Sequence, residues 1–343
     1  MTSVYIFFFI ATIYLTTLNS LQKKNKFCLD RVSSGEKHKI LASFKKRIPL
    51  SGSFFFLPVF FYLLFPDNIL LFSTCLLFFS LGLLSDIKKI SSPKNRFLLQ
   101  IIILTIYISF QESLVLDLRI NFLDTIMESD FFRILILSFF LLVLINGFNF
   151  IDGVNNLCSL NFLIVLFFLY LLGNDLDNFL FLYEIKVLII FLLVFVFLNF
   201  FGKNFLGDGG VYGISFLIGV LSIEISTLSE KISPYFIANL LWYPAFENLF
   251  SIVRRSVYKR KNYLADNFHL HQLILKFFIK YKILKKKKYL LSSFTGICVN
   301  FYLIIIYIIG YQFYSKTNIQ VMLISISIFI YILLYVFLLK KIR

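Results

Sequence analysis

The chain of 343 residues is 59% hydrophobic and 15% charged, and its mean hydropathy is +0.86. A soluble globular protein is about half apolar and lacks repeated apolar runs of spanning length, so this composition excludes a soluble domain and indicates a polytopic membrane protein. The net charge of +16 would by itself suggest a nucleic-acid partner, but the basic residues sit in short loops between apolar runs. That pattern follows the positive-inside rule and argues against nucleic acid.

Eleven apolar runs are long enough to cross a bilayer, which takes about 20 residues, or fewer where the ends snorkel. They are centred in 4–21, 50–66, 68–84, 97–113, 131–148, 157–173, 183–201, 211–228, 235–252, 289–313 and 318–339. The weakest are 50–66 and 235–252, the second because it contains Pro244, Glu247 and Asn248. The expected fold is all-α, a single membrane domain over residues 1–343 with about eleven transmembrane helices.

Loop charge orients these runs. Basic residues fill the loops after the first, third and ninth runs and the C-terminal end, whereas the loops after the second, fourth and sixth runs carry acidic residues. Because positively charged loops stay in the cytoplasm, we expect a multi-pass protein with its N-terminus outside and its C-terminus inside.

Four polar stretches follow runs that head inward, and each holds an acidic residue: Asp86, Asp152, Asp208 and Asp266. In NGFNFIDGVNN (146–156), Asn146 and Asn149, and then Asn149 and Asp152, are three apart, so each pair can be neighbours at a helix end. A helix cap followed by a solvated turn is the alternative for this stretch alone, since Asn and Asp favour turns. Independent turns would not need to gather carboxylates at one membrane face, so we expect a single cytoplasmic active site.

The residue types in these stretches favour phosphate chemistry. Carboxylates beside amide oxygens, without Cys ligands, suit Mg²⁺, or Mn²⁺ as the alternative, better than zinc. Interleaved Lys and Arg suit an anionic substrate whose phosphates share the metal. Phe205 can stack on a base, although packing is the ordinary role of one Phe among 46. His269 and His271 are two apart, which suits an extended or irregular loop better than a helix.

Five segments resemble, in order, the motifs of the polyprenyl-phosphate N-acetylhexosamine-1-phosphate transferases, glycosyltransferase family 4. They are RIPLSGS at 47–53, GLLSDIKKISSPKNRFLLQ at 82–100, NGFNFIDGVNNL at 146–157, NFFGKNFLGDGG at 199–210 and DNFHLHQL at 266–273. The resemblance covers about residues 31–273 and leaves 289–339 as further C-terminal spans.

The resemblance implies an enzyme of the bacterial inner membrane that moves N-acetylhexosamine-1-phosphate, with GlcNAc or a related sugar, from a UDP-sugar to undecaprenyl phosphate. The products are undecaprenyl-diphosphate-sugar and UMP, at the start of a cell-envelope polysaccharide such as an O-antigen or a cell wall polymer. The implied partners are the UDP-N-acetylhexosamine, undecaprenyl phosphate and the lipid bilayer. A homodimer is left open.

The same carry-over gives each site residue a role. Asp208 is the implied main Mg²⁺ ligand and Asn149 the second. The implied catalytic residues are Asp86, which positions or deprotonates the lipid phosphate, and Asp152, which contacts the nucleotide or the metal. The implied substrate-binding residues are Lys45, Lys46, Asn146, Asn155, Lys203, Phe205, His269 and His271. Among these Lys203 and either Lys45 or Lys46 meet phosphate, Phe205 stacks on uracil, and the histidines hold the sugar phosphate or diphosphate.

The sequence departs from the family pattern at several positions. Ser85 stands where the family has the first Asp of a pair, Asn156 and Ser53 each replace a Gly, and Gly210 replaces a Ser. Ser85 argues against a mechanism that needs both carboxylates. H-L-H in place of three successive His points away from the peptidoglycan enzyme and toward the O-antigen or cell wall polymer group.

Two other functions compete with the transferase. A secondary transporter for an anionic phosphorylated metabolite would place its acids near the bilayer midplane in two related halves. Here the acids follow one face, and no internal repeat is visible. A scaffold without activity would leave the clustering of Asn and Asp unexplained.

Overall fold

The computed structural model describes residues 2–30, 48–112, 114, 117–176, 179–257, 268–283 and 288–342. This part of the chain is 80% helical, with 13 helices, so the expected all-α polytopic fold is confirmed. The helices are α1 (Thr2–Asn25), α3 (Gly52–Leu64), α4 (Ile69–Asp86), α5 (Pro93–Ser109), α6 (Asn121–Met127), α7 (Asp130–Ile151), α8 (Leu157–Asn174), α9 (Leu182–Phe200), α10 (Gly207–Leu228), α11 (Pro234–Val257), α12 (Leu270–Lys280), α13 (Lys288–Gln312) and α14 (Thr317–Ile342). Two short strands, β1 (Leu29–Asp30) and β2 (Ile48–Pro49), pair antiparallel.

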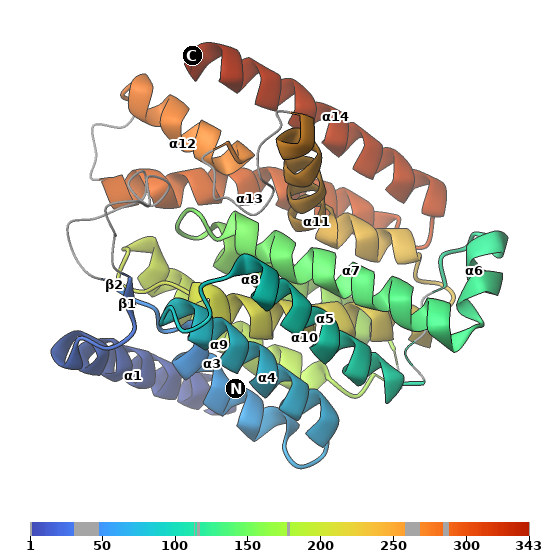
Figure 1. The fold of residues 1–343 in the computed structure, drawn as a ribbon, viewed down its shortest axis with the longest axis horizontal. Coiled ribbons are helices and arrows are strands. Elements are labelled where there is room, and N and C mark those ends of the chain that lie inside the picture. The colour runs from blue at the N-terminus through green and yellow to red at the C-terminus, as the bar shows by residue number, and fades with distance from the viewer. Residues whose placement is uncertain are drawn as a thin grey trace.

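Each of the eleven apolar runs coincides with a helix, and eight of these helices are long and apolar enough to cross a membrane. The other three are α3, α5 and α11, which include both of the runs that the sequence marks as weakest. The helix α3 has only 13 residues, and α11 carries Glu247 and Asn248 with Pro244 inside it. Proline removes a helix hydrogen bond, and Figure 1 shows α11 bending out of the direction of its neighbours.

The helix α10 lies at the centre of the bundle, packed on α3, α4, α7 and α8 (Figure 1). In its spanning segment 78% of the residues are buried, against 17% for α1 and 28% for α14. The approach of α4 to α10 is backbone to backbone, because a Cβ on Gly82 would lie 2.3 Å from Gly209 Cα. This contact brings the C-terminal end of α4 to the N-terminal end of α10.

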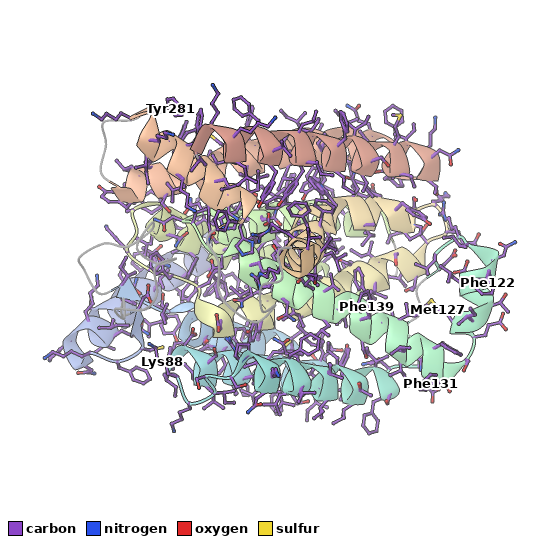
Figure 2. The ribbon with its side chains drawn as sticks, turned by 45° about the horizontal axis from the view of Figure 1, so that its top comes forward. Lys88, Phe122, Met127, Phe131, Phe139 and Tyr281 are labelled. Carbon is purple, nitrogen blue, oxygen red and sulfur yellow. The ribbon has the colours of Figure 1, made fainter. Side chains whose placement is uncertain are left out.

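The flanks of the bundle expose large apolar side chains, including Phe131 and Phe139, as expected of surfaces that face lipid. Figure 2 shows Lys88, which follows α4, and Tyr281, which follows α12, at one end of the bundle. Phe122 and Met127 of α6 lie at the other end. The described parts of the polar stretches therefore gather at the end of the bundle that carries Lys88.

Candidate active site

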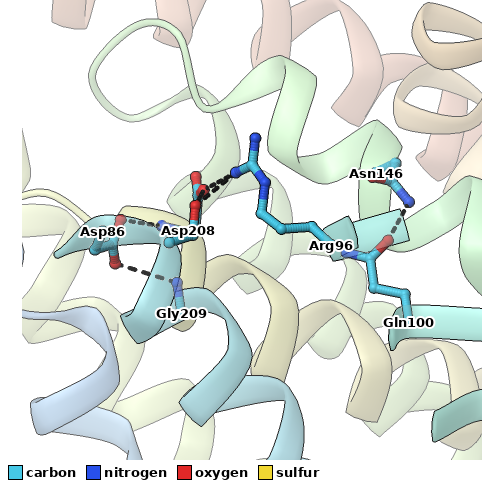
Figure 3. A network of polar contacts seen from close by, with 7 residues as sticks. Asp86, Arg96, Gln100, Asn146, Asp208 and Gly209 are labelled. Atoms are coloured by element: carbon cyan, nitrogen blue, oxygen red, sulfur yellow. Dashed lines mark hydrogen bonds and ion pairs between the residues drawn. The ribbon is translucent and has the colours of Figure 1, made fainter. Parts of the chain in front are cut away.

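Asp208 is the centre of a polar network that joins three helices (Figure 3). It lies in the first turn of α10, and its Oδ2 accepts hydrogen bonds from the Ser85 hydroxyl at 2.5 Å and from Arg96 Nη1 at 2.6 Å. Arg96 also donates to Ser85 Oγ at 2.6 Å. Ser85 is near the end of α4 and Arg96 near the start of α5, where Pro93 begins the helix. The segment 82–100 thus folds back so that both side chains reach the same carboxylate.

Asp86 binds the N-terminal end of α10. Its Oδ1 accepts from the Asp208 backbone N–H at 2.9 Å, and its Oδ2 accepts from the Gly209 N–H at 3.3 Å. The first N–H groups of a helix lack partners within the helix and carry partial positive charge, so a carboxylate is stabilised there. Gly207 has a φ of +71°, and a Cβ on it would lie 2.6 Å from Asp86 Oδ2. A glycine is required at this position for both reasons.

The segment 48–52 lies beside the loop that precedes α10. Ser51 N–H donates to Phe205 O at 3.0 Å, and Phe205 N–H donates to Pro49 O at 2.9 Å. The Phe205 side chain is half-buried and makes no ring contact with another described residue. Lys203 is exposed, with its ammonium 5.6 Å from the ring centre of Phe201. Lys45, Lys46 and Asp266 lie outside the described residues.

Asn146 connects α7 to the helix that carries Arg96. Its Nδ2 donates to Gln100 Oε1 at 2.8 Å, and Gln100 lies one turn after Arg96 on α5 (Figure 3). Asn149 is half-buried, and its side chain forms no hydrogen bond with a described residue. Asp152 is the C-terminal cap of α7 and is also half-buried. The first part of the stretch 146–156 is therefore helical rather than a turn.

The rest of that stretch is a tight turn held by buried amides. Asn156 has a φ of +61°, a left-handed conformation that Asn tolerates better than most residues, and this accounts for Asn in place of the family's Gly. Its N–H donates to Asn199 Oδ1 at 2.6 Å, and Asn199 Nδ2 donates to Asn204 O at 2.6 Å. Asn155 is buried, and its Nδ2 lacks a partner among the described residues. Asn199 thereby ties the 146–156 and 199–210 segments together.

The two histidines lie at the start of α12. His269 is the N-terminal cap, whereas His271 is inside the helix, so the expectation of an irregular loop is wrong for His271. Their rings stack nearly parallel, with centres 5.6 Å apart. His271 is fully buried, its ring nitrogens have no partner within the described part of the chain, and burial lowers the pKa of His271 to about 3. A Cβ on Gly153 would lie 2.6 Å from His271 Nε2, so the histidine segment packs directly on the 146–156 turn.

Three residues of this end of the bundle were missing from the predicted site. Arg96 and Asn199 stand within the family-like segments, so the motifs themselves carried the signal. Glu247 pairs with His269, with Oε1 and Nδ1 2.9 Å apart. In the sequence it was visible only as a charge that weakens a span, and only tertiary contact reveals its partner.

The donor atoms at Asp208 fit a magnesium ion better than zinc. Among the described residues, no three His, Cys, Asp or Glu side chains gather into a closed metal-binding group. Magnesium is usually held by one or two carboxylates together with substrate phosphates and water. Asp208 is 26% exposed, and its Oδ1 accepts no hydrogen bond from a described residue, so one carboxylate oxygen is available to an ion that shares its ligands with a phosphate.

Comparison with known proteins agrees with this geometry. A search of curated proteins gives no match. The sequence model of Glycosyl transferase family 4 matches residues 68–226, which run from α4 to α10 and include Ser85, Asp86, Arg96 and Asp208. The region that builds the network in Figure 3 thus matches glycosyl transferase family 4, the family of the polyprenyl-phosphate sugar-1-phosphate transferases.

Proposed function

We propose that this sugar-phosphate transferase moves N-acetylhexosamine-1-phosphate from a UDP-sugar to undecaprenyl phosphate and releases UMP. The observation that carries the proposal is the network of Asp208, Ser85, Arg96 and Asp86 at one end of a membrane bundle. At that end a water-soluble nucleotide and the phosphate of a membrane lipid can reach the same carboxylate and guanidinium.

The reaction needs two anionic phosphates to come together. An oxygen of the lipid phosphate attacks the phosphorus that is attached to the sugar, and the bond from this phosphorus to the UMP oxygen breaks. Arg96, which is 21% exposed, supplies positive charge next to the attacked group, and the positive end of α10 adds to it. Catalysis of this kind depends mainly on alignment and charge stabilisation.

Asp208 would hold Mg²⁺, or Mn²⁺, with Asn149 as a second ligand, and the ion would offset phosphate charge. Asp86 is anchored to the first turn of α10 and therefore fixes the position of Asp208. In the nucleotide site Phe205 stacks on uracil, Lys203 meets a phosphate, and Asp152 contacts the nucleotide or the ion.

The remaining substrate contacts come from the 146–156 segment and α12. Asn146 and Asn155 face the nucleotide, and His269 and His271 hold the sugar phosphate or diphosphate. In this proposal the site faces the cytoplasmic side of a bacterial inner membrane, with the N-terminus outside and the C-terminus inside. The enzyme acts in an O-antigen or cell wall pathway. A homodimer stays a prediction.

The test is a transfer assay on the detergent-solubilised protein, with undecaprenyl phosphate and UDP-GlcNAc or a related UDP-sugar as substrates. The release of UMP is the quantity measured. Asp208→Asn keeps the side-chain shape and should abolish release, whereas Asp67→Asn, an exposed residue of the loop between α3 and α4, should leave it unchanged. EDTA should stop the wild-type reaction, and Mg²⁺ or Mn²⁺ should restore it. UMP release that persists in EDTA, or in Asp208→Asn, would contradict the metal assignment.

A further inference from the structure

Glu247 is a fully buried carboxylate inside α11. Burying a charge inside a protein is costly unless it is paired, so such a residue usually faces a partner. The sequence match to the family, over 68–226, does not include this residue. Its role therefore has to come from its contacts.

Each Glu247 oxygen has its own partner. Oε1 is 2.9 Å from His269 Nδ1, and Oε2 accepts from the Tyr331 hydroxyl at 2.9 Å. His269 caps α12 and Tyr331 belongs to α14, so the carboxylate joins three helices. Tyr331 is itself 2% exposed and packs edge-on against Phe246 and Phe250 of α11, which holds its hydroxyl in place.

This arrangement determines which nitrogen of His269 carries hydrogen. An ionised carboxylate only accepts hydrogen bonds, so Nδ1 must be the donor, and in the neutral ring Nε2 is then the acceptor. The backbone of His269 is held as well, because its N–H donates to Gln272 Oε1 at 3.4 Å. The ring lies beside Phe150 of α7, with centres 5.3 Å apart, and so faces the 146–156 segment.

Other described side chains also lie around the His269 ring. The Ser251 hydroxyl is 3.3 Å from Nδ1 and accepts from Arg254 at 3.4 Å, and Arg255 lies over the Phe150 ring. His271 stacks on the ring from α12. Among the described neighbours, Glu247 is the one carboxylate bonded to Nδ1.

We propose that Glu247 and Tyr331 are positioning residues that hold His269 in the Nδ1–H tautomer, in which Nε2 is the nitrogen that accepts a hydrogen bond from a hydroxyl of the transferred sugar. The inference rests on the proposed function, in which His269 holds the sugar phosphate. It also gives α14, which lies beyond the region matched to the family, a part in building the site.

The tautomer can be read directly by ¹⁵N NMR of histidine-labelled protein, since the chain has only three His. His269→Gln identifies the His269 signals by their loss. In the wild type His269 should show a protonated Nδ1 when the ring is neutral. The amide side chain in Glu247→Gln can donate a hydrogen bond as well as accept one, so the preference of His269 for Nδ1–H should disappear. A wild-type His269 with hydrogen on Nε2, or an unchanged spectrum in Glu247→Gln, would overturn the proposal.

Transfer kinetics give the second readout. Glu247→Gln should lower kcat about ten- to a hundredfold, the usual scale for an outer partner of a functional histidine, and Tyr331→Phe should lower it less while Nδ1 stays protonated. Tyr331→Phe keeps the test open if Glu247→Gln does not fold. Two variants serve as controls. Tyr243→Phe removes a buried hydroxyl that has no partner among the described residues, and Glu224→Gln removes a carboxylate of α10. Both control enzymes should transfer the sugar phosphate at the wild-type rate.

The two hypotheses fail separately. If the wild type transfers no sugar phosphate, the proposed function is wrong, and the ¹⁵N spectra still decide whether Glu247 sets the tautomer. If the wild type is active and Glu247→Gln matches it in kcat and spectrum, the positioning role is wrong and the function stands.

Discussion

Ser85 occupies the place of a family carboxylate, and the structure shows what its hydroxyl does there. It donates to Asp208 Oδ2 at 2.5 Å and accepts from Arg96 at 2.6 Å. Ser85→Ala removes both contacts but leaves the direct bond from Arg96 to the same Asp208 oxygen, at 2.6 Å. The perturbation therefore separates the hydroxyl from the ion pair.

The expected cost follows from these contacts. A hydrogen bond to a charged group contributes about 1.5–3 kcal/mol, but Arg96 still holds Asp208, and water can reach its side chain, which is 26% exposed. We therefore expect a loss of about 1 kcal/mol in transition-state stabilisation, or roughly fivefold in rate. Arg96→Gln removes the positive charge as well and should cost roughly ten- to a hundredfold. Asp86→Asn weakens the anchor of the first turn of α10, which positions Asp208, and should cost at least about a hundredfold.

The assay is UMP release at saturating substrates, repeated over a range of Mg²⁺ concentrations. Ser91→Ala is the control, because Ser91 is an exposed serine of the loop that follows α4. Ser85→Asp restores the family's carboxylate and should be tolerated, because Arg96 can neutralise a second negative charge. The reasoning is refuted if Asp86→Asn is active, or if Ser85→Ala is as inactive as Asp86→Asn. An active Asp86→Asn would mean that the anchoring of α10 by Asp86 is not needed for transfer, and an inactive Ser85→Ala would mean that Arg96 alone does not hold Asp208 in place.

Three further outcomes are expected. On a background without native cysteines, a cysteine at Asn121 should react with an impermeant thiol reagent in intact cells and one at Ser91 should not; both positions are exposed, and the reverse result would invert the orientation. Gly82→Ala should lower Tm and activity, since its Cβ would meet backbone at 2.3 Å, whereas the Cβ in Gly219→Ala would meet side-chain atoms of Leu141 and Leu144 and should cost less. As pH falls from about 6.5 to 5, the wild type should lose about 2 kcal/mol more stability than His271→Gln. The reason is that the pKa of His271, about 3 in the folded protein, is below its unfolded value, so the unfolded chain binds a proton that the folded protein does not. Equal slopes of Tm against pH for the two proteins would contradict this.

The sequence by itself determined the class of protein and the order of its helices. Hydropathy is a local property that sums along each run, and all eleven runs became helices. It also located the segments that hold Ser85, Asp86, Asn146 and Asp208, because their residue types suit phosphate and metal whatever surrounds them.

Only the tertiary structure decided which of these residues meet. Ser85 and Asp208 are 123 positions apart, and they touch because Gly82 and Gly209 let two helix backbones come together. Glu247 weakens its span when the run is taken alone, yet in the fold it pairs with a histidine and a tyrosine from two later helices. A buried charge is costly or useful according to its partners, and those partners come from parts of the chain that a local pattern does not connect.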